Sequence, residues 1–345
     1  MTGLSGGVEY QFAVAARSSA GLGDRSEVVS VSTSSAVAAS PVATHQTASS
    51  ITLSWSAPTV STGAEATGYQ VYLVTVGAGT TEPVYTVVYD GAGSTATSVE
   101  LSSLDSGSLY TYVLSSLSAA GESDYSAPMS ASTAPGVATG LLSTLQTTSS
   151  IALSWTAPTI PSGSAVTGYK VYSRSGSVGL AVQGVDGTDS VVTDSLVYDG
   201  RGDITTSTDP TTELDDLEGG SLYTYLVGVL SLAGESDRSA SLDVSTAAPA
   251  PTALTSVSQT TTGMELSWTA PEVSSGEAVT GYKVYRDDGA GGAVDVVAYD
   301  SRENSGDYVA TSCSVSGLTG GLTYTYEVSA LSLAGESDRS AAMVS

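Results

Sequence analysis

The stretch "IALSWTAPTIPSGSAVTGYKVY", residues 151–172, decides the fold. Apolar side chains occupy every second position from Ile151 through Leu153 to Trp155, which is the period of a β-strand with one buried face. Pro, Ser and Gly then interrupt the pattern before a second apolar segment ends in "GYKVY". Short strands bounded by turn-forming residues, without a helical period, predict an all-β protein.

The same arrangement occurs three times along the chain. The segments "ITLSWSAP", "IALSWTAP" and "MELSWTAP" contain the three Trp residues, at positions 55, 155 and 268. Each is followed by "TGYxVY", then by a Leu with a Tyr six residues later, and then by a turn, "AGESD". A looser copy of this turn, "SSAGLGDRS" at 18–26, precedes the first repeat. Internal repetition of this kind predicts a tandem array of similar modules.

Taken together, these motifs resemble those of fibronectin type III domains, and the resemblance covers essentially the whole chain. It rests on the Trp followed by "AP", on "GYxVY", on Leu-x5-Tyr and on "AGESD". It implies a linear array of seven-stranded immunoglobulin-like β-sandwiches without disulfides, in agreement with a single Cys. It also implies a tyrosine corner, in which a Tyr hydroxyl bonds back to the backbone. The residues at that position are Tyr10, Tyr110, Tyr223 and Tyr324.

Alignment of the repeats predicts four parts. Residues 1–36 match only the last strands of a domain, because Met1 aligns with apolar strand positions of the later repeats. Complete domains are expected over 37–134, 135–247 and 248–345, the second with an insertion near 179–190. We therefore expect a window from a longer array. The alternative is that strands of another molecule complete the first part by β-addition.

The repeated turn has a local explanation and a longer-range one. Locally, its Gly permits a positive φ and its Asp can hold the turn through an Asx-type hydrogen bond. In the resembling fold the turn faces the preceding domain, opposite that domain's bend before the tyrosine corner. Repetition of both surfaces would repeat one interdomain contact. The short, Pro-bearing linkers at 132–141 and 245–254 would then favour a stiff array.

Composition restricts the partners. Lys and Arg number 10 against 35 Asp and Glu, which gives a formal net charge of −25. Such a surface repels phosphate backbones and anionic membranes, so we expect no nucleic-acid partner and no direct membrane insertion. No apolar run approaches the roughly 20 residues that span a bilayer. The expected partners are other copies of the chain or neighbouring domains of the same long chain.

Candidate site residues are few, and each has a structural alternative. Arg201-Gly202-Asp203 spells the integrin-recognition tripeptide, but it follows "VYDG", where the other repeats carry polar hairpin turns. His45 is expected at an ordinary strand position, and Cys313 is expected to be a small core residue rather than a reactive thiol. An acidic group near the second bend is expected to be a solvated face rather than a calcium site. This group comprises Glu213, Asp215, Asp216 and Glu218.

No arrangement of residues predicts catalysis, and no cofactor is expected, with calcium as the one alternative. A lone His excludes His-based zinc sites and most acid–base dyads. We expect a non-enzymatic structural segment, such as a stalk, a spacer or a filament-forming array, of a large extracellular or surface protein. The alternatives are an adhesion or ligand-binding module that acts through its loops, and an accessory spacer of a large secreted enzyme.

Overall fold

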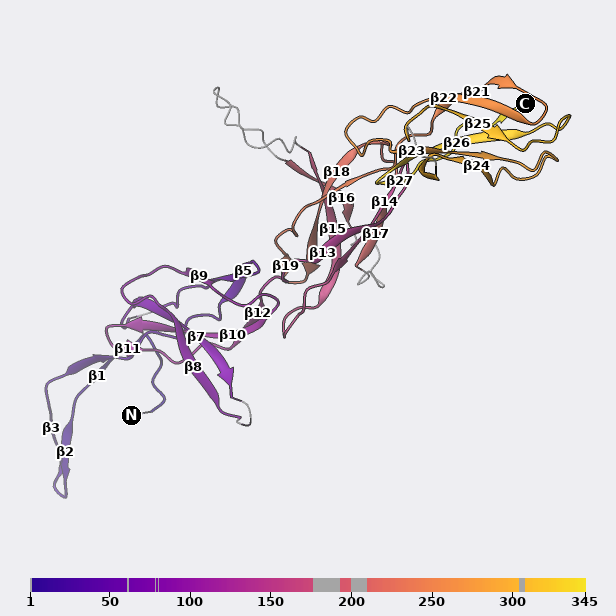
Figure 1. Cartoon of the computed structure of the whole chain (residues 1–345). Coiled ribbons are helices and arrows are strands. Elements are labelled where there is room, and N and C mark those ends of the chain that lie inside the picture. Colours follow the sequence, from indigo (N-terminus) through magenta and orange to yellow (C-terminus); the bar gives the residue numbers. More distant parts are fainter. Residues whose placement is uncertain are drawn as a thin grey trace, which may run out of the picture. The chain divides into compact units, whose positions relative to one another are not determined.

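The computed structural model describes residues 2–60, 62–77, 79, 81–175, 193–199, 210–303 and 308–345 (Figure 1). Within these ranges the regular structure is β, apart from one turn of 3-10 helix at Ser301–Glu303. The expectation of an all-β fold is therefore confirmed. The chain divides into two compact units. The first consists of Met1–Gly136, Pro158–Thr167 and Val229–Asp237, and the second of Val137–Ala157, Gly168–Gly228 and Arg238–Ser345.

Residues 2–36 contribute four short strands, arranged as two antiparallel pairs. β1 (Glu9–Phe12) pairs with β4 (Val29–Ser32), and β2 (Ala15–Ser18) pairs with β3 (Gly21–Arg25). Val14, Val29 and Val31 are all more than half exposed. β4 therefore carries apolar side chains that are exposed within the part of the chain that the structure describes, and Val14 is exposed between β1 and β2.

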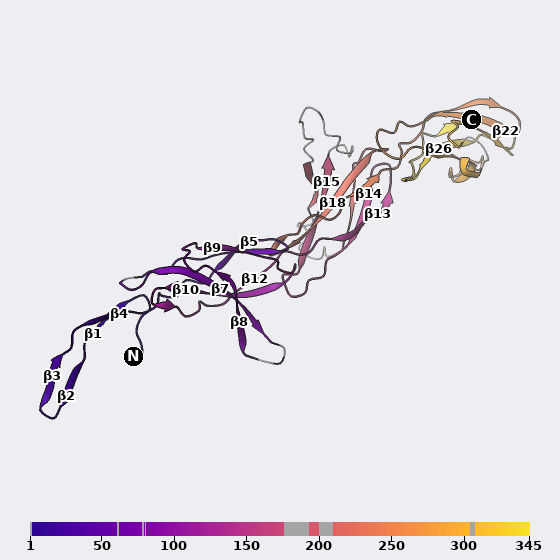
Figure 2. The same cartoon turned by 60° about the vertical axis from the view of Figure 1, so that its left-hand side comes forward.

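The first complete sandwich has a sheet of three strands and a sheet of five. The small sheet has the order β5-β6-β9, and the large sheet has the order β11-β10-β7-β8, with β12 also on β10. The bounds are β5 Val42–Gln46, β6 Ser50–Ser54, β7 Ala66–Val76, β8 Pro83–Asp90, β9 Ser98–Ser102, β10 Leu109–Ser118, β11 Gly121–Glu122 and β12 Met129–Ser132. β7 and β10 lie side by side (Figures 1 and 2).

The second and third sandwiches repeat this topology. In the second, the small sheet is β13-β14-β17 and the large one is β16-β15-β18-β19 with β20 on β18. In the third, the sheets are β21-β22-β25 and β24-β23-β26-β27 with β28 on β26. The bounds in the second are β13 Thr139–Gln146, β14 Ile151–Thr156, β15 Val166–Ser175, β16 Thr193–Asp199, β17 Thr211–Leu214, β18 Leu222–Ser231, β19 Gly234–Glu235 and β20 Leu242–Ser245. Those in the third are β21 Thr252–Gln259, β22 Gly263–Thr269, β23 Gly281–Arg286, β24 Val296–Asp300, β25 Ser312–Ser316, β26 Thr325–Ser332, β27 Gly335–Glu336 and β28 Met343–Val344.

The alternating pattern of the sequence places the core between the two sheets. Ile51, Leu53 and Trp55 are at most 7% exposed, because alternate side chains of a strand point to the same face. The indole of Trp55 meets the ring of Tyr69, on the opposite sheet, edge-on at 5.4 Å. The equivalent pairs Trp155–Tyr169 and Trp268–Tyr282 lie 5.2 and 5.3 Å apart. Trp and the first Tyr of "GYxVY" are therefore packing residues.

One edge of the large sheet is irregular. β11 and β12 both pair with β10, and the six residues between them form no strand. The same interruption separates β19 from β20 and β27 from β28. Each pair of short strands takes the place of one interrupted edge strand, which agrees with a seven-stranded sandwich. The interruption coincides with the repeated "GESD" turn.

Candidate functional site

The glycine of the repeated turn adopts the backbone conformation that the sequence predicts. Its φ is +129° at Gly21, +117° at Gly121, +123° at Gly234 and +126° at Gly335. These angles disfavour residues with a Cβ atom. The turn therefore begins in the same way at all four positions.

Serine hydroxyls complete the turn by replacing the missing strand pairing. Ser126 accepts a hydrogen bond from the backbone N–H of Leu114 at 3.0 Å and donates to the carbonyl of Ala127 at 3.0 Å. The equivalent acceptors for strand N–H groups are Ser26, Ser239 and Ser340, at 2.9–3.1 Å. Three residues earlier in each of the three complete repeats, Ser123, Ser236 and Ser337 accept a hydrogen bond from a second N–H group of the neighbouring strand. The interrupted edge thus leaves these backbone donors satisfied.

The predicted role of the aspartate differs from the observed one. An Asx-type bond would place the Asp side chain as acceptor, but in this turn serine hydroxyls donate to the backbone carbonyls of Asp124, Asp237 and Asp338. Serine is suited to this position because its hydroxyl both donates and accepts. One side chain can therefore accept a hydrogen bond from a strand N–H group and donate one to a carbonyl of the turn.

The glutamate of "GESD" forms a hydrogen-bond centre that the sequence analysis missed. Glu336 accepts hydrogen bonds from Ser329 at 2.7 Å, from Lys283 at 2.8 Å and from the hydroxyl of Tyr285. In the first sandwich Glu122 accepts from Tyr72 and Ser115, both at 2.6 Å. The signal available in the sequence was that Glu and the second Tyr of "GYxVY" recur together in all three repeats.

Burial and these hydrogen bonds act on the glutamate in opposite directions. Burial alone would raise the pKa of Glu336, but the hydrogen bonds from Lys283, Tyr285 and Ser329 outweigh it and lower the pKa below its ordinary value. Burial, reinforced by the bond to Glu336, raises the pKa of Tyr285. The guanidinium of Arg339 covers the Tyr285 ring at 3.8 Å. The carboxylate of Glu336 is therefore ionised and is held by a neutral phenol, a serine hydroxyl and the ammonium group of Lys283, an arrangement that suits stability rather than proton transfer.

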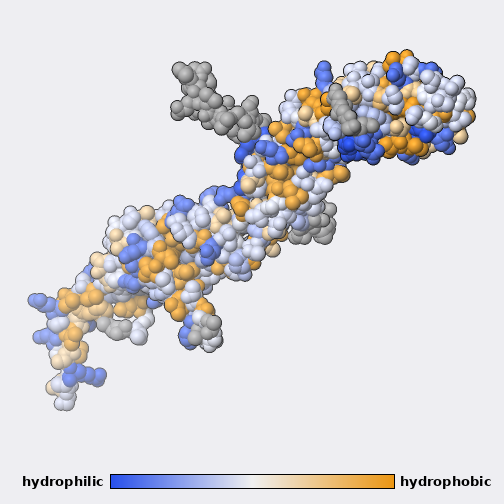
Figure 3. All heavy atoms as spheres, viewed as in Figure 1, coloured by the Kyte–Doolittle hydropathy of each residue, from blue (hydrophilic) through white to orange (hydrophobic). Residues whose placement is uncertain are grey.

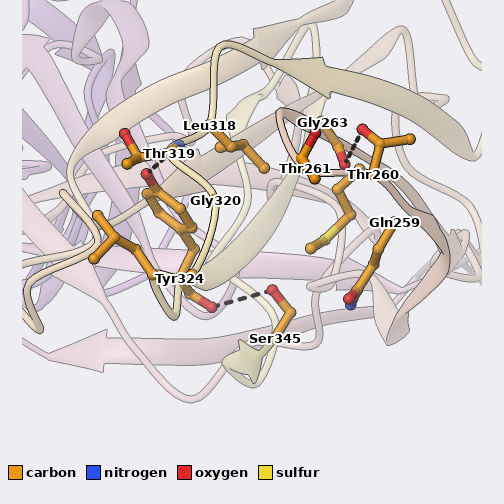
Figure 4. Close-up of a pocket in the computed structure, with 12 residues that line it drawn as sticks. Gln259, Thr260, Thr261, Gly263, Leu318, Thr319, Gly320, Tyr324 and Ser345 are labelled. Carbon is orange, nitrogen blue, oxygen red and sulfur yellow. Dashed lines mark hydrogen bonds between the residues drawn. The ribbon is translucent and has the colours of Figure 1, made fainter.

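The tyrosine corners hold the bend that precedes β10, β18 and β26. The hydroxyl of Tyr110 accepts from the N–H of Asp105 at 2.8 Å, and that of Tyr223 accepts from Glu218 at 2.8 Å. Tyr10 and Tyr324 bind Ser5 and Thr319 in the same way, and the bond of Tyr324 is shown in Figure 4. All four predicted tyrosine corners are confirmed.

A backbone hydrogen bond to each of the first three bends recurs at three junctions, each between one part of the chain and the next sandwich. The carbonyl of Gly7 accepts a hydrogen bond from the N–H of Gly63 at 2.9 Å. Gly107 accepts from Gly163 at 2.8 Å within the first compact unit, and Gly220 accepts from Gly276 at 2.9 Å within the second. The donor in each case lies in the loop after the Trp strand of the following sandwich. We call these three loops, "VSTG" 60–63, "IPSG" 160–163 and "VSSG" 273–276, the docking loops; Ser61 of the first one lies outside the described residues.

A second hydrogen bond accompanies the first at each junction. The backbone N–H of Leu109 donates to the hydroxyl of Ser162 at 3.1 Å, and that of Leu222 donates to Ser275 at 3.0 Å. Glu9 and Thr62 form the same bond at 3.3 Å. Each pair is separated by 53 residues. The docking loop and the bend therefore meet with one register throughout.

The docking loops require glycine because the backbone of the bend approaches them closely, and not because φ is positive. A Cβ atom at Gly163 would lie 2.6 Å from the carbonyl carbon and oxygen of Gly107, and one at Gly276 would lie 2.7 Å from those of Gly220. At Gly63 the corresponding distance to Gly7 is 2.4 Å. No side chain fits such a space without displacing the neighbouring backbone.

The sequence predicts that the repeated turn faces the bend of the preceding domain. The preceding domain is correct, but the surface that the turn contacts is a different one. The turn does face the preceding domain: a Cβ atom at Gly335 would lie 3.4 Å from the carbonyl of Gln146, and the N–H of Asp338 donates to Thr148 at 3.1 Å. However, Gln146 is the last residue of β13, and Thr148 lies in the turn between β13 and β14. The bend, which the sequence analysis placed opposite the repeated turn, is occupied by the docking loop instead.

The remaining site predictions have separate outcomes. Cys313 is 9% exposed in β25, and desolvation raises the pKa of its thiol to about 12, so its assignment to the core is confirmed. His45 lies in β5 opposite Thr52, as expected. Arg201, Gly202 and Asp203 fall outside the described residues, as does the insertion at 179–190.

The four acidic residues of the second bend are exposed, as expected for a solvated face. Glu213 accepts a hydrogen bond from Ser150 at 3.0 Å. Across the described ranges, no set of three or more His, Cys, Asp or Glu side chains is placed to bind a metal ion. In the same ranges, no helix has the length and apolar character to span a membrane.

Comparison with known proteins agrees with this architecture. The fibronectin type III domain model matches residues 36–132, 136–245 and 249–345. Chitinase A1 of Niallia circulans is 39% identical over 137 residues, which is 37% of this chain; the chain spans 17% of the length of that relative.

Among solved structures, the chicken CNTN1 FN1-FN3 domains align with 90% of this chain and 97% of that one, at 14% identity and a TM-score of 0.32. A segment of two fibronectin type III domains from chicken tenascin aligns with 60% of this chain and 98% of that one, at 16% identity and a TM-score of 0.29. The match of the family model to three successive stretches covers most of the sequence, and the chain therefore belongs to the fibronectin type III family, with three domains in tandem.

Proposed function

We infer that this chain is a non-enzymatic spacer segment of a larger extracellular protein, and that it fixes the separation of the parts it connects. One observation carries this proposal. The same pair of hydrogen bonds, from docking loop to bend and from bend to docking loop, recurs at three successive junctions. A segment that only tethered its neighbours would need no such contact.

The linkers add a further constraint to each junction. Ala134 is fully buried; its N–H donates to the carbonyl of Thr47 at 2.9 Å, and its carbonyl accepts from Gly107 at 2.9 Å. In the second unit Ala247 is bound in the same way between Thr147 and Gly220. A linker with both backbone groups paired has lost most of its conformational freedom. This supports a junction of restricted motion.

The relative among the curated proteins favours one setting for such a spacer. The name of that relative, chitinase A1, describes a polysaccharide-degrading enzyme, and the similarity extends over 137 residues. We therefore place this segment, as a second and compatible proposal, in a secreted polysaccharide-degrading enzyme, where it separates other domains. The arrangement of the described residues suits this non-catalytic role, because their buried ionisable groups are engaged in packing and in hydrogen bonds.

Single-molecule energy transfer tests the spacer. In a Cys313→Ser background, dyes on cysteines introduced at the exposed positions Glu100 and Thr144 report the distance across the junction that contains Gly163. We expect a single narrow distance distribution in the parent chain and a broader one with Gly163→Ala. Gly23→Ala is the control, because a Cβ atom there meets only one atom, at 3.5 Å. A distribution in the parent chain as broad as that of Gly163→Ala would overturn the proposal.

Retention on insoluble chitin separates the spacer from a binding module. A spacer passes through a chitin column without delay, whereas a ligand-binding segment is retained and is released by soluble chitin fragments. Retention of the chain on chitin would contradict the spacer proposal and would instead indicate a ligand-binding function that acts through the loops.

A further inference from the structure

Three tyrosine rings gather on the outer face of the large sheet of the first sandwich. Tyr72 lies in β7 and Tyr85 in the neighbouring strand β8 (Figure 1), and Tyr125 lies in the turn between β11 and β12. Tyr72 follows the core residue Val71, so its side chain points away from the core. The Tyr125 ring lies 4.9 Å from that of Tyr72 and 4.8 Å from that of Tyr85. We call these three rings the tyrosine cluster.

Two of the three rings present surface to solvent. Tyr85 is 42% exposed and Tyr125 is 41% exposed, whereas Tyr72 is 7% exposed beneath them. Large aromatic side chains usually bury most of their area. Two adjacent exposed rings on one sheet face are therefore a candidate for ligand contact.

Tyr72 joins the cluster to a carboxylate. Its hydroxyl donates to Glu122 at 2.6 Å, and the hydroxyl of Ser115 donates to the same carboxylate oxygen at 2.6 Å. Burial and the bond to Glu122 raise the pKa of Tyr72, so its hydroxyl stays protonated. The carboxylate of Glu122 is thus held by two neutral groups, and its side chain is exposed.

In the other two sandwiches, cations occupy the corresponding place. In the third, the guanidinium of Arg339 covers the Tyr285 ring at 3.8 Å, and the ammonium group of Lys283 donates to Glu336 at 2.8 Å. In the second, the guanidinium of Arg238 covers the ring of Tyr172 at 3.2 Å. The fold therefore brings a guanidinium to this tyrosine in both repeats that carry an arginine.

The first sandwich lacks both cations. By alignment of the repeated turn, Tyr125 stands at the position of Arg238 and Arg339, and Gln70 stands at the position of the lysine of "GYKVY". Moreover, residues 37–134 contain four Glu and three Asp but no Lys or Arg. The acidic and aromatic groups of this place are kept, while the cations are absent from the whole sandwich.

This face of the sheet is a lateral surface that a preceding sandwich leaves open. The third sandwich follows the second within one compact unit, yet the side chain of Arg339 remains 35% exposed there. Its contacts with Tyr285, Asp295 and Glu327 all lie within the third sandwich. The exposure of Tyr85 and Tyr125 on the equivalent face therefore has the same lateral character.

The chemistry of the place favours a guanidinium as the ligand. The face of a tyrosine ring attracts cations, and a planar guanidinium stacks on aromatic rings while it donates to a carboxylate. The negative charge of this sandwich disfavours an anion. A neutral sugar ring can also stack on tyrosine, but the arrangements in the other two sandwiches favour the guanidinium.

We propose that the tyrosine cluster and Glu122 form a binding site for an arginine side chain carried by a basic segment of a partner protein. The incoming guanidinium lies against the exposed rings of Tyr85 and Tyr125 and supplies the positive charge that the other sandwiches supply from their own chain. The proposal does not require that the array acts as a spacer.

The test titrates the full chain with a blocked glycine–arginine–glycine peptide. Its matched control carries citrulline, in which a neutral urea group replaces the guanidinium. Isotope-labelled tyrosine rings are followed by NMR. We expect shifts at Tyr85 and Tyr125 and an affinity at least about fivefold higher for the arginine peptide, as one cation–π contact provides. The half-exposed ring of Tyr308, in the third sandwich, is the internal reference and should not shift.

Two variants locate the site. Tyr125→Arg restores the residue that the other sandwiches carry, so the shift of Tyr85 should disappear. Glu122→Gln should weaken binding by roughly threefold, the effect of one exposed ion pair. Glu100→Gln removes the same charge from an exposed position in β9, on the other sheet, and should leave binding unchanged. The comparison of the two peptides uses the parent chain alone, so it stands even if a variant fails to fold.

Three results would overturn the proposal. The first is equal affinity for the two peptides, or no shift with either. The second is equal weakening by Glu122→Gln and Glu100→Gln, which would show a general attraction to the acidic surface. The third is a shift of Tyr85 and Tyr125 with soluble chitin fragments but not with the arginine peptide, which would identify a sugar as the ligand.

Discussion

The hydroxyl group of Ser126 serves two backbone groups in the repeated turn, and its removal should show how much the turn depends on serine. Ser126→Ala leaves the buried N–H of Leu114 without its acceptor. A buried donor without a partner costs about 1–3 kcal/mol, so we expect a loss of that size in the free energy of unfolding. Urea denaturation measures it, with the exposed Ser98→Ala as control. Equal stability of the two variants would show that water satisfies this N–H group.

Glu336 makes the stability of the third sandwich depend on pH. Its pKa is lower in the folded state than in the unfolded chain, so the ionised carboxylate stabilises the fold above the ordinary glutamate range. That contribution is lost as the pH falls through the folded-state pKa, below about 4.3. Glu336→Gln should cost roughly 1–2 kcal/mol at pH 7 and weaken the acid dependence of the melting temperature. The assignment would be contradicted if the melting temperature of Glu336→Gln depended on acid pH in the same way as that of the parent chain and of the control Glu303→Gln.

At the scale of elements, the tyrosine corner positions the bend on which a docking loop rests. Tyr223→Phe removes the acceptor for the N–H of Glu218 while it keeps the ring that packs under the bend. We expect a loss of about 1–2 kcal/mol and faster hydrogen exchange at Leu222 and Gly276, whose N–H groups form the junction. Tyr308→Phe, at a half-exposed ring, is the control. Faster exchange confined to the bend, with Gly276 unchanged, would show that the corner and the junction are independent.

The sequence predicts strands and corners better than junctions, for a physical reason. Strand pairs such as β5–β6 follow from an alternating pattern that is complete within a few residues. The corner is implied by the resemblance to fibronectin type III domains, to which Leu-x5-Tyr contributes. The bond between Leu109 and Ser162 joins residues 53 apart in two different loops, and neither loop has a periodic pattern. Gly163 is read as an ordinary turn residue, because only the structure shows the backbone of Gly107 against it.

At the scale of the whole molecule, the acidic charge acts against close association. The formal net charge is −25, and the edge strands β8 and β24 carry exposed apolar residues, among them Val84, Val87 and Val297. Figure 3 shows hydrophobic residues interspersed with hydrophilic ones on the visible face of the molecule. Exposed edges of this kind favour pairing with other strands, while a common negative charge opposes it. The balance between the two depends on ionic strength, because salt screens the repulsion between surface charges.

Salt should therefore stabilise the chain, and it also separates general screening from specific calcium binding. We expect the melting temperature to rise by a few degrees between about 10 and 150 mM NaCl, over which the screening length falls from roughly 30 to 8 Å. Since no group of three or more metal-binding side chains was found in the described ranges, CaCl₂ and MgCl₂ at equal concentrations should raise the melting temperature equally. A larger rise with CaCl₂ would reveal oxygen ligands that select the larger ion, because calcium accepts more ligands in looser geometry than magnesium does. The acidic residues of the second bend, such as Asp215 and Asp216, would then be the first positions to replace.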